Sequence, residues 1–191
     1  MITVIGVIII VVVMLLIFWA AMMYNTLARG RNTCDESWSG IDTELKRRYE
    51  LIPNLVNTVK GYATHEREVM ERVSQARTVA MASQGSPSSQ ARDENVLVDN
   101  LRRMLAVVEN YPDLKASHSF LQLQDELVNT EDRIQRARRF YNGNVRDYNN
   151  RVEIFPSNMV ARCCSFKRRE FFEIQVAVER EAPAVKLHQP T

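Results

Sequence analysis

The chain opens with an unbroken hydrophobic run. Residues 2–23 are uncharged and almost wholly apolar, and every Lys, Arg, Asp and Glu comes after Tyr24. At a rise of about 1.5 Å per residue a helix of this length covers about 33 Å, which is enough to cross a bilayer. A cleavable signal peptide would have a basic start and small residues at the cut, but bulky Phe18 and Trp19 stand here. The run predicts a retained transmembrane anchor over residues 1–24, with these side chains facing lipid: Ile5, Ile9, Val12, Leu16 and Trp19.

The charges beside this run predict its orientation. No basic residue precedes it, whereas Arg29 and Arg31 follow closely and residues 46–48 add three more basic side chains. Loops that carry Lys and Arg tend to stay in the cytoplasm. We therefore expect a short N-terminus outside and a cytoplasmic C-terminal domain, where cysteines remain reduced.

Beyond the anchor, apolar residues recur at alternating steps of three and four, as on one buried helix face. The stripe comprises Ile41, Leu45, Tyr49, Ile52, Val56, Val59 and Ala63, and it extends through Val69, Val73, Ala76 and Ala80. Pro53 falls inside it, where proline removes a backbone donor and crowds the preceding turn. Because the stripe keeps its phase across Pro53, it predicts one long helix with a kink.

The rest of the chain also has helical spacing. The Ser-rich residues 84–90 mark a break, and a helix follows with Val96, Leu97, Leu101, Leu105 and Val108 facing inward. A turn at residues 110–113 leads to the longest pattern, which predicts a helix from about Ser117 to about Val152. Residues 155–158 should end it, with Ser157 capping a further helix.

These elements predict an all-α fold, in which an N-terminal transmembrane helix precedes an antiparallel bundle of long helices resembling a four-helix bundle. The bundle occupies residues 25–170, and residues 171–191 form a loose polar tail. The alternative for such long stripes is a coiled coil between chains. Short connections between the helices favour packing within one chain.

The net charge and the sequence motifs argue against several classes of function. The 191 residues carry a net charge of +2, whereas dedicated nucleic-acid binders have a clear basic excess. His65 begins a segment like that of zinc proteases, but position 69 is Val and the second histidine is missing. Cys163 and Cys164 are adjacent, and they either bind a soft metal, form a strained disulfide or, as we favour, simply pack. We find no catalytic, metal or cofactor motif, and we expect a protein that is not an enzyme.

Arginines crowd the second half of the longest predicted helix at Arg133, Arg136, Arg138 and Arg139. On a membrane-tethered domain such a surface can contact anionic lipid or a partner, at about 1 kcal/mol per residue near the bilayer. The alternative is a solvated face with acidic neighbours, among them Glu131 and Asp132. We favour the solvated face.

The assembled segments resemble the LemA family, bacterial single-pass membrane proteins related to the magnetosome protein MamQ. The segments that carry the resemblance are Trp38-Ser39, Ile41-Asp42, Leu45-Lys46-Arg47-Arg48, Leu51-Ile52-Pro53-Asn54, Val59-Lys60-Gly61-Tyr62, Tyr111-Pro112, Phe140-Tyr141-Asn142 and Phe155-Pro156-Ser157-Asn158. The resemblance implies an anchored helical bundle in the bacterial inner membrane, without catalytic residues. Its signature positions are Asp42, Arg47, Arg48, Pro53, Asn54 and Lys60, and we expect the polar ones to be buried or to bridge helices.

Two functions follow from the anchor and the resemblance. The first is a non-enzymatic membrane scaffold or adaptor that presents its bundle to a protein partner in the membrane, with self-association as a further expectation. The second is an accessory subunit or regulator of an HtpX-type membrane protease. A redox or metal sensor built on Cys163 and Cys164 is the weakest alternative.

Overall fold

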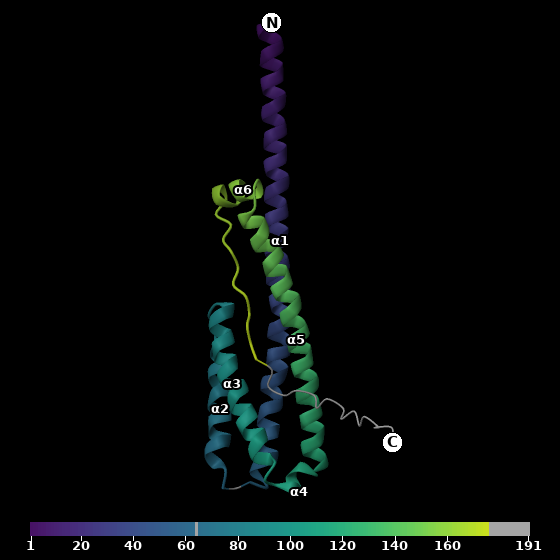
Figure 1. Cartoon of the computed structure of the whole chain (residues 1–191), viewed down its shortest axis with the longest axis vertical. Coiled ribbons are helices and arrows are strands. Elements are labelled where there is room, and N and C mark those ends of the chain that lie inside the picture. The colour runs from purple at the N-terminus through teal and green to yellow at the C-terminus, as the bar shows by residue number, and fades with distance from the viewer. Residues whose placement is uncertain (64, 176–191) are drawn as a thin grey trace, which may run out of the picture. The chain divides into compact units, whose positions relative to one another are not determined.

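The computed structural model describes residues 1–63 and 65–175, which form helices and no strand (Figure 1). The helices are α1 (Ile2–Lys60), α2 (Arg67–Ala82), α3 (Pro87–Val108), α4 (Pro112–Lys115), α5 (His118–Glu153) and α6 (Ser157–Cys163). The all-α prediction is confirmed, and α5 begins and ends within about a residue of the predicted helix. Helix α1 continues through Pro53, as the unbroken phase of its stripe predicted.

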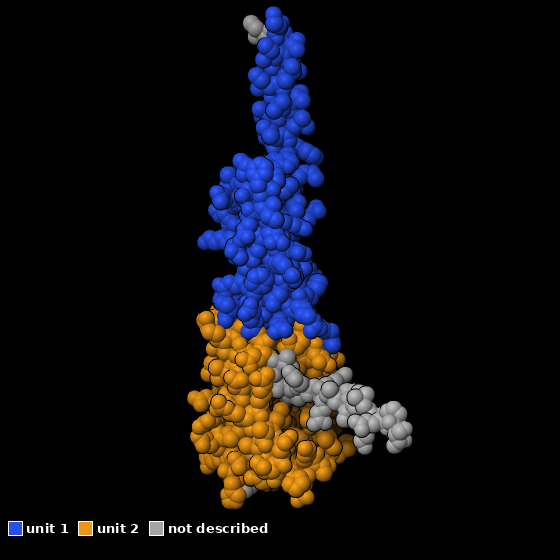
Figure 2. All heavy atoms as spheres, viewed as in Figure 1, with its two compact units in different colours: residues 1–43, 86–88, 136–173 blue, residues 44–85, 89–135, 174–191 orange. Residues whose placement is uncertain are grey.

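The described chain divides into two compact units, which Figure 2 colours separately. Unit 1 comprises Met1–Thr43, Ser86–Ser88 and Arg136–Glu173, and unit 2 comprises, among the described residues, Glu44–Gly85, Ser89–Gln135, Ile174 and Gln175. Each of the long helices α1 and α5 contributes residues to both units. The two units are therefore described one at a time.

In unit 1 the first part of α1 packs against the second half of α5. The ring of Trp38 lies 5.2 Å from that of Tyr141, and a Cβ atom added at Gly30 would lie 3.2 Å from Cδ2 of Tyr148. From the first contact to the second, the residue number rises from 141 to 148 on α5 and falls from 38 to 30 on α1. The two helices are therefore antiparallel. Gly30 leaves room for the Tyr148 ring.

Unit 2 buries one face of each of its helices in a shared core. The buried side chains include Ile52, Leu55, Val59, Val73, Leu97, Leu101, Leu127 and Ile134, from α1, α2, α3 and α5. Amphipathic helices of this kind gain most of their stability from such packing rather than from helix propensity. The four helices of unit 2 therefore pack together as in a helical bundle.

The predicted single helix from residue 41 to residue 80 is wrong in one place. Helix α1 ends at Lys60, and α2 begins at Arg67. The backbone N–H of Ala63 donates to the Val59 carbonyl at 2.9 Å, and that of Glu66 donates to the Ala63 carbonyl at 3.1 Å. The spacing of apolar residues did not indicate this turn, because both helices bury their apolar faces and Ala63, which lies between the helices, is also buried.

Three smaller expectations are corrected. Val96 is exposed, because α3 turns Val98 into the core instead. Ser157 does not cap α6, since its hydroxyl donates backward to the Arg151 and Ile154 carbonyls at the end of α5. The predicted loose tail begins too early, because Phe172 and Ile174 are buried. The remainder of that tail, residues 176–191, lies outside the described residues.

Pro53 is accommodated inside α1 by a side chain from α2. Because proline has no backbone N–H, the carbonyl of Tyr49, four residues earlier, loses its helical donor. Nε of Arg77 donates to that carbonyl at 2.6 Å. The guanidinium therefore supplies the hydrogen bond that Pro53 removes.

This contact predicts that the effects of residues 53 and 77 are coupled. Arg77→Ala should lower the free energy of unfolding by about 1–3 kcal/mol in the native sequence, because the Tyr49 carbonyl loses its donor. In a Pro53→Ala background, where residue 53 regains its N–H, the same change should cost much less. Urea unfolding of the full chain in detergent micelles, followed by circular dichroism, measures the cycle. Strictly additive effects would contradict the assignment.

Candidate functional site

The apolar part of α1 is not covered by other described elements. Ile5, Ile9, Val12 and Leu16 expose between 48% and 59% of their surface, and Trp19 is half-buried. Figure 2 shows this stretch of unit 1 standing clear of other protein atoms. Within the described residues, α1 is the one helix long and apolar enough to cross a membrane, with a mean hydropathy of 3.2 in its most apolar window. A contiguous apolar surface of this kind is typical of a segment that is covered by lipid or by another protein.

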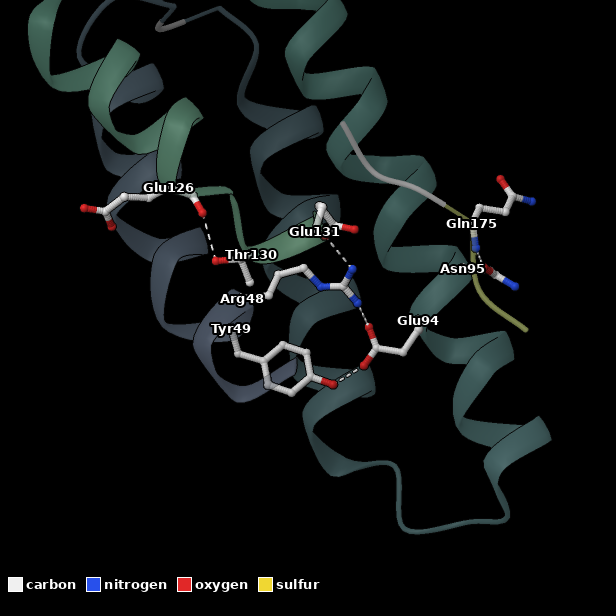
Figure 3. A network of polar contacts seen from close by, with 8 residues as sticks. All are labelled: Arg48, Tyr49, Glu94, Asn95, Glu126, Thr130, Glu131 and Gln175. Atoms are coloured by element: carbon white, nitrogen blue, oxygen red, sulfur yellow. Dashed lines mark hydrogen bonds and ion pairs between the residues drawn. The ribbon is translucent and has the colours of Figure 1, made fainter. Parts of the chain in front are cut away.

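The most deeply buried polar residues of unit 2 are charged. Arg48 on α1 donates through Nη1 to Oε1 of Glu131 on α5 at 2.7 Å, and through Nη2 to Oε2 of Glu94 on α3. The Tyr49 hydroxyl donates to the other oxygen of Glu94 (Figure 3). The side chains of Arg48 and Glu94 have no exposed surface, and that of Glu131 has 1%. We call Arg48, Tyr49, Glu94 and Glu131 the Arg48 cluster. It joins three helices, and its buried side chains are not accessible to a second protein.

One guanidinium faces two carboxylates in this cluster. Burial raises the pKa of Glu94, and the attraction of Arg48 and the hydrogen bond from Tyr49 only partly oppose that effect. Burial alone would lower the pKa of Arg48, but Glu131 and Glu94 outweigh it and raise that pKa. The fold therefore keeps Arg48 charged, and Glu94 holds a proton more tightly than an exposed glutamate does.

In unit 1 an extended segment, residues 165–173, lies along α5, and we call it the strap. Asn149 holds both backbone groups of Arg169, with N–H···Oδ1 at 2.8 Å and Nδ2–H···O=C at 2.9 Å. Asn142 holds both groups of Phe172 in the same way, at 2.9 and 3.0 Å. The side-chain amide of each asparagine thus forms hydrogen bonds with both the backbone N–H and the backbone carbonyl of one strap residue. A neighbouring β-strand would pair with these two backbone groups in the same way.

Two tyrosines of α5 complete this clamp. The Tyr148 hydroxyl donates to the Lys167 carbonyl at 3.0 Å, and the Tyr141 hydroxyl donates to the Glu170 carbonyl at 2.9 Å. Burial raises the pKa of Tyr141 to about 12, so this hydroxyl remains a donor at neutral pH. The Phe172 ring meets Trp38 edge-on at 5.1 Å. The strap is thereby held through both its backbone and its aromatic side chains.

The predicted signature residues do not form one site. Arg48 is buried as expected and Pro53 is half-buried, as is Asp42. Arg47, Asn54 and Lys60 are exposed, because they fall outside the buried stripe of α1. Of these, Lys60 helps to line an open hollow of about 710 Å³ between α1 and α2, together with Val56, Asn57, Arg67, Met70, Glu71 and Ser74.

The four arginines of α5 that the sequence singled out differ in exposure, and they belong to both units. Arg133, Arg136 and Arg139 are exposed, and Arg138 is half-buried. Glu131, which the sequence suggested as a solvated neighbour, is instead buried in the Arg48 cluster, since it lies on the same helix face as Leu127 and Ile134.

The cysteines separate into two environments. Cys163 and Cys164 are exposed, which corrects the expectation that they pack, because α6 turns them away from the core of unit 1. Cys34 is buried, and burial raises the pKa of its thiol, which lowers its reactivity. Among the residues that the structure describes, no group of three His, Cys, Asp or Glu side chains is placed to hold a metal ion.

Comparison with known proteins identifies the family. The family model described as "LemA family" matches residues 37–187. The chain belongs to the LemA family. This LemA-family chain is 30% identical to Protein LemA of Metamycoplasma hominis, over 72% of this chain and 63% of that protein. It is 28% identical to Magnetosome protein MamQ 1 of Paramagnetospirillum magneticum, over 80% of this chain and 65% of that protein.

A second magnetosome relative, Magnetosome protein MamQ of Magnetospirillum gryphiswaldense, is 25% identical over 79% of this chain and 65% of its own length. The chain thus spans about 65% of the length of the curated relatives that it matches. Together with the apolar stretch of α1, these relatives support a membrane-associated protein of the LemA type.

The Arg48 cluster predicts a large difference between two neighbouring arginines. Arg48→Met should lower the free energy of unfolding by about 3–5 kcal/mol, because it leaves buried carboxylates without their cation. Arg47→Met, at the adjacent exposed position, should change it by less than about 0.5 kcal/mol. Urea unfolding of both full-length variants in the same micelles measures the difference. Equal effects would show that the Arg48 cluster does not carry the packing of unit 2.

The raised pKa of Glu94 predicts a pH dependence with a definite sign. The pKa of Glu94 is higher in the folded chain than in the unfolded chain, so the folded chain binds this proton more tightly. As the pH rises from the unfolded pKa to the folded pKa, the contribution of Glu94 to the free energy of unfolding therefore falls. Glu94→Gln removes the contribution. The stability of Glu94→Gln relative to the native chain should therefore improve as the pH rises above about 4.5. Unfolding curves collected between acid and neutral pH test this, and a relative stability that worsens with pH would contradict it.

Proposed function

We propose that this LemA-family protein is a non-enzymatic scaffold or adaptor of the bacterial inner membrane. Its apolar N-terminal helix crosses the bilayer once, and its helical bundle stands on the cytoplasmic side, where it engages a protein partner at the membrane. The excess of basic residues after the apolar stretch supports this orientation.

The observation that carries this proposal is the continuity of α1. The helix runs from Ile2 to Lys60, so the apolar stretch passes into the folded part without a linker. A flexible linker would let a tethered domain search a volume around its anchor. A continuous helix instead restricts how the domain leaves the membrane, which suits the presentation of a surface to a partner in the same membrane.

The surface of unit 2 offers apolar positions for such a partner. Val79 and Met81 on α2, Val96 on α3 and Leu121 on α5 each expose about half of their side chains or slightly more. Exposed apolar side chains are the ones that gain most from being covered in a complex. Arg133, an exposed arginine of α5 within unit 2, adds a charge that contributes orientation and specificity.

Photo-crosslinking in native membranes tests the scaffold. A photoreactive amino acid at Val79 or Val96 of the full chain should yield light-dependent adducts with a second protein, which mass spectrometry identifies. The same residue at Arg103, an exposed polar position on the same helix as Val96, is the matched control for incidental collisions. Recovery of monomer alone, under conditions where the span crosslinks efficiently to lipid, would refute the scaffold.

An accessory role for a membrane protease requires the same anchor but gives a different readout. Deletion of the protein should then change the turnover of that protease's substrates in the membrane. Adduct formation with unchanged substrate turnover supports the scaffold and rejects the accessory role.

A further inference from the structure

Three large apolar side chains protrude where α5 gives way to α6. Ile154, Phe155 and Met159 expose 60%, 72% and 57% of their surface. They lie within six residues of one another, at the end of α5 and in the first turn of α6. A cluster of exposed apolar side chains of this kind is typical of a surface that is covered by another molecule.

The register between α1 and α5 places this corner along the anchor. Tyr141 lies beside Trp38, and Tyr148 lies beside Gly30. Because the helices are antiparallel, a move of seven residues toward the C-terminal end of α5 matches a move of eight residues toward the N-terminal end of α1. A further step of the same size leads past the end of α5 to Phe155, and along α1 to Met22, close to the end of the proposed span at Tyr24. The protruding side chains are thus level with the point at which the proposed span ends.

A second set of contacts gives the same placement independently. The backbone N–H of Phe166 donates to the Ala161 carbonyl of α6 at 2.9 Å. The ring of Phe166 in turn meets the ring of Tyr24 at 5.4 Å. Tyr24 is the last residue of the proposed span. Figure 1 shows α6 beside α1 in this region of unit 1.

Basic side chains accompany the apolar ones. Arg151, Arg162 and Lys167 are exposed on the end of α5, on α6 and at the start of the strap. Two further cations are engaged with carboxylates, since Arg168 pairs with Glu153 at 2.8 Å and Arg169 pairs with Asp35 at 2.6 Å. Apolar side chains flanked by cations are the pattern of a surface that lies at the headgroup level of an anionic bilayer.

We propose that this corner is a lipid-binding collar, in which Ile154, Phe155 and Met159 enter the interface while Arg151, Arg162 and Lys167 contact lipid phosphates. The collar rests on the membrane anchorage within the proposed function and does not depend on the scaffold role. It gives unit 1 a second attachment to the bilayer beside the span. Two attachments restrain both the tilt and the rotation of the unit, which a single helix leaves free.

A fluorescent depth probe tests the collar on the full chain in liposomes. An environment-sensitive NBD group is attached to cysteine in Phe155→Cys or Met159→Cys, with the three native cysteines replaced. Phe140→Cys is the matched control, because Phe140 is 64% exposed on α5 but lies about 20 Å before the end of that helix. In vesicles containing phosphatidylglycerol, the collar probes should show blue-shifted emission and severalfold weaker quenching by aqueous iodide than the control.

The outcomes separate the parts of the proposal. Equal iodide quenching at positions 155, 159 and 140 overturns the collar. A probe at Val12 reports the anchor by itself, so a lipid-shielded Val12 with a water-exposed position 155 refutes the collar and leaves the proposed function standing. Replacing Arg151, Arg162 and Lys167 together by Gln should bring the probe depth in anionic vesicles to that in phosphatidylcholine vesicles. A probe depth that is the same in anionic and in phosphatidylcholine vesicles overturns the role of these three cations in binding anionic lipid.

Discussion

The apolar stretch of α1 is the constraint on which the rest of this structure depends. No described element covers it, and burying its side chains elsewhere would be worth about 1.5–3 kcal/mol for each large one. In the function that we propose, lipid covers this stretch and no further protein is needed to do so. In unit 1 the remainder of α1 is paired with α5, on which the strap lies. The close contact at Gly30 and the ring pair of Trp38 and Tyr141 hold α1 to α5 there.

Unit 2 depends on a different kind of interaction. Four helices with similar apolar stripes can pack in several registers, and hydrophobic contact alone discriminates poorly between them. The Arg48 cluster is satisfied only when α1, α3 and α5 meet at one level. We interpret it as a device for specificity, since a buried ion cluster contributes little net stability but makes wrong pairings costly. Pro53 and Arg77 act similarly for α2, because the orphaned Tyr49 carbonyl needs one particular partner.

Much of this could be predicted from the sequence, and the failures have physical causes. Helix α5 and the continuity of α1 through Pro53 follow from periodicity. The Arg48 cluster left a readable signal that the interpretation missed: Arg48, Glu94 and Glu131 each sit on the buried stripe of their own helix, beside Leu45, Leu97 and Leu127. The turn after Lys60 gave no signal because the apolar stripe crosses it. The asparagine clamp could not be foreseen, since Asn142 and Asn149 recognise backbone rather than side chains.

The most direct test of the central claim is a depth profile along α1 in a bilayer. Nitroxide labels at successive positions from Ile5 to Arg47 of the full chain, read by power-saturation electron paramagnetic resonance, compare access to oxygen with access to an aqueous nickel complex. The account predicts oxygen access and nickel exclusion around Ile9, Val12 and Leu16, with the change to aqueous access close to Tyr24. Nickel access at Val12 equal to that at the exposed Arg47 would contradict it.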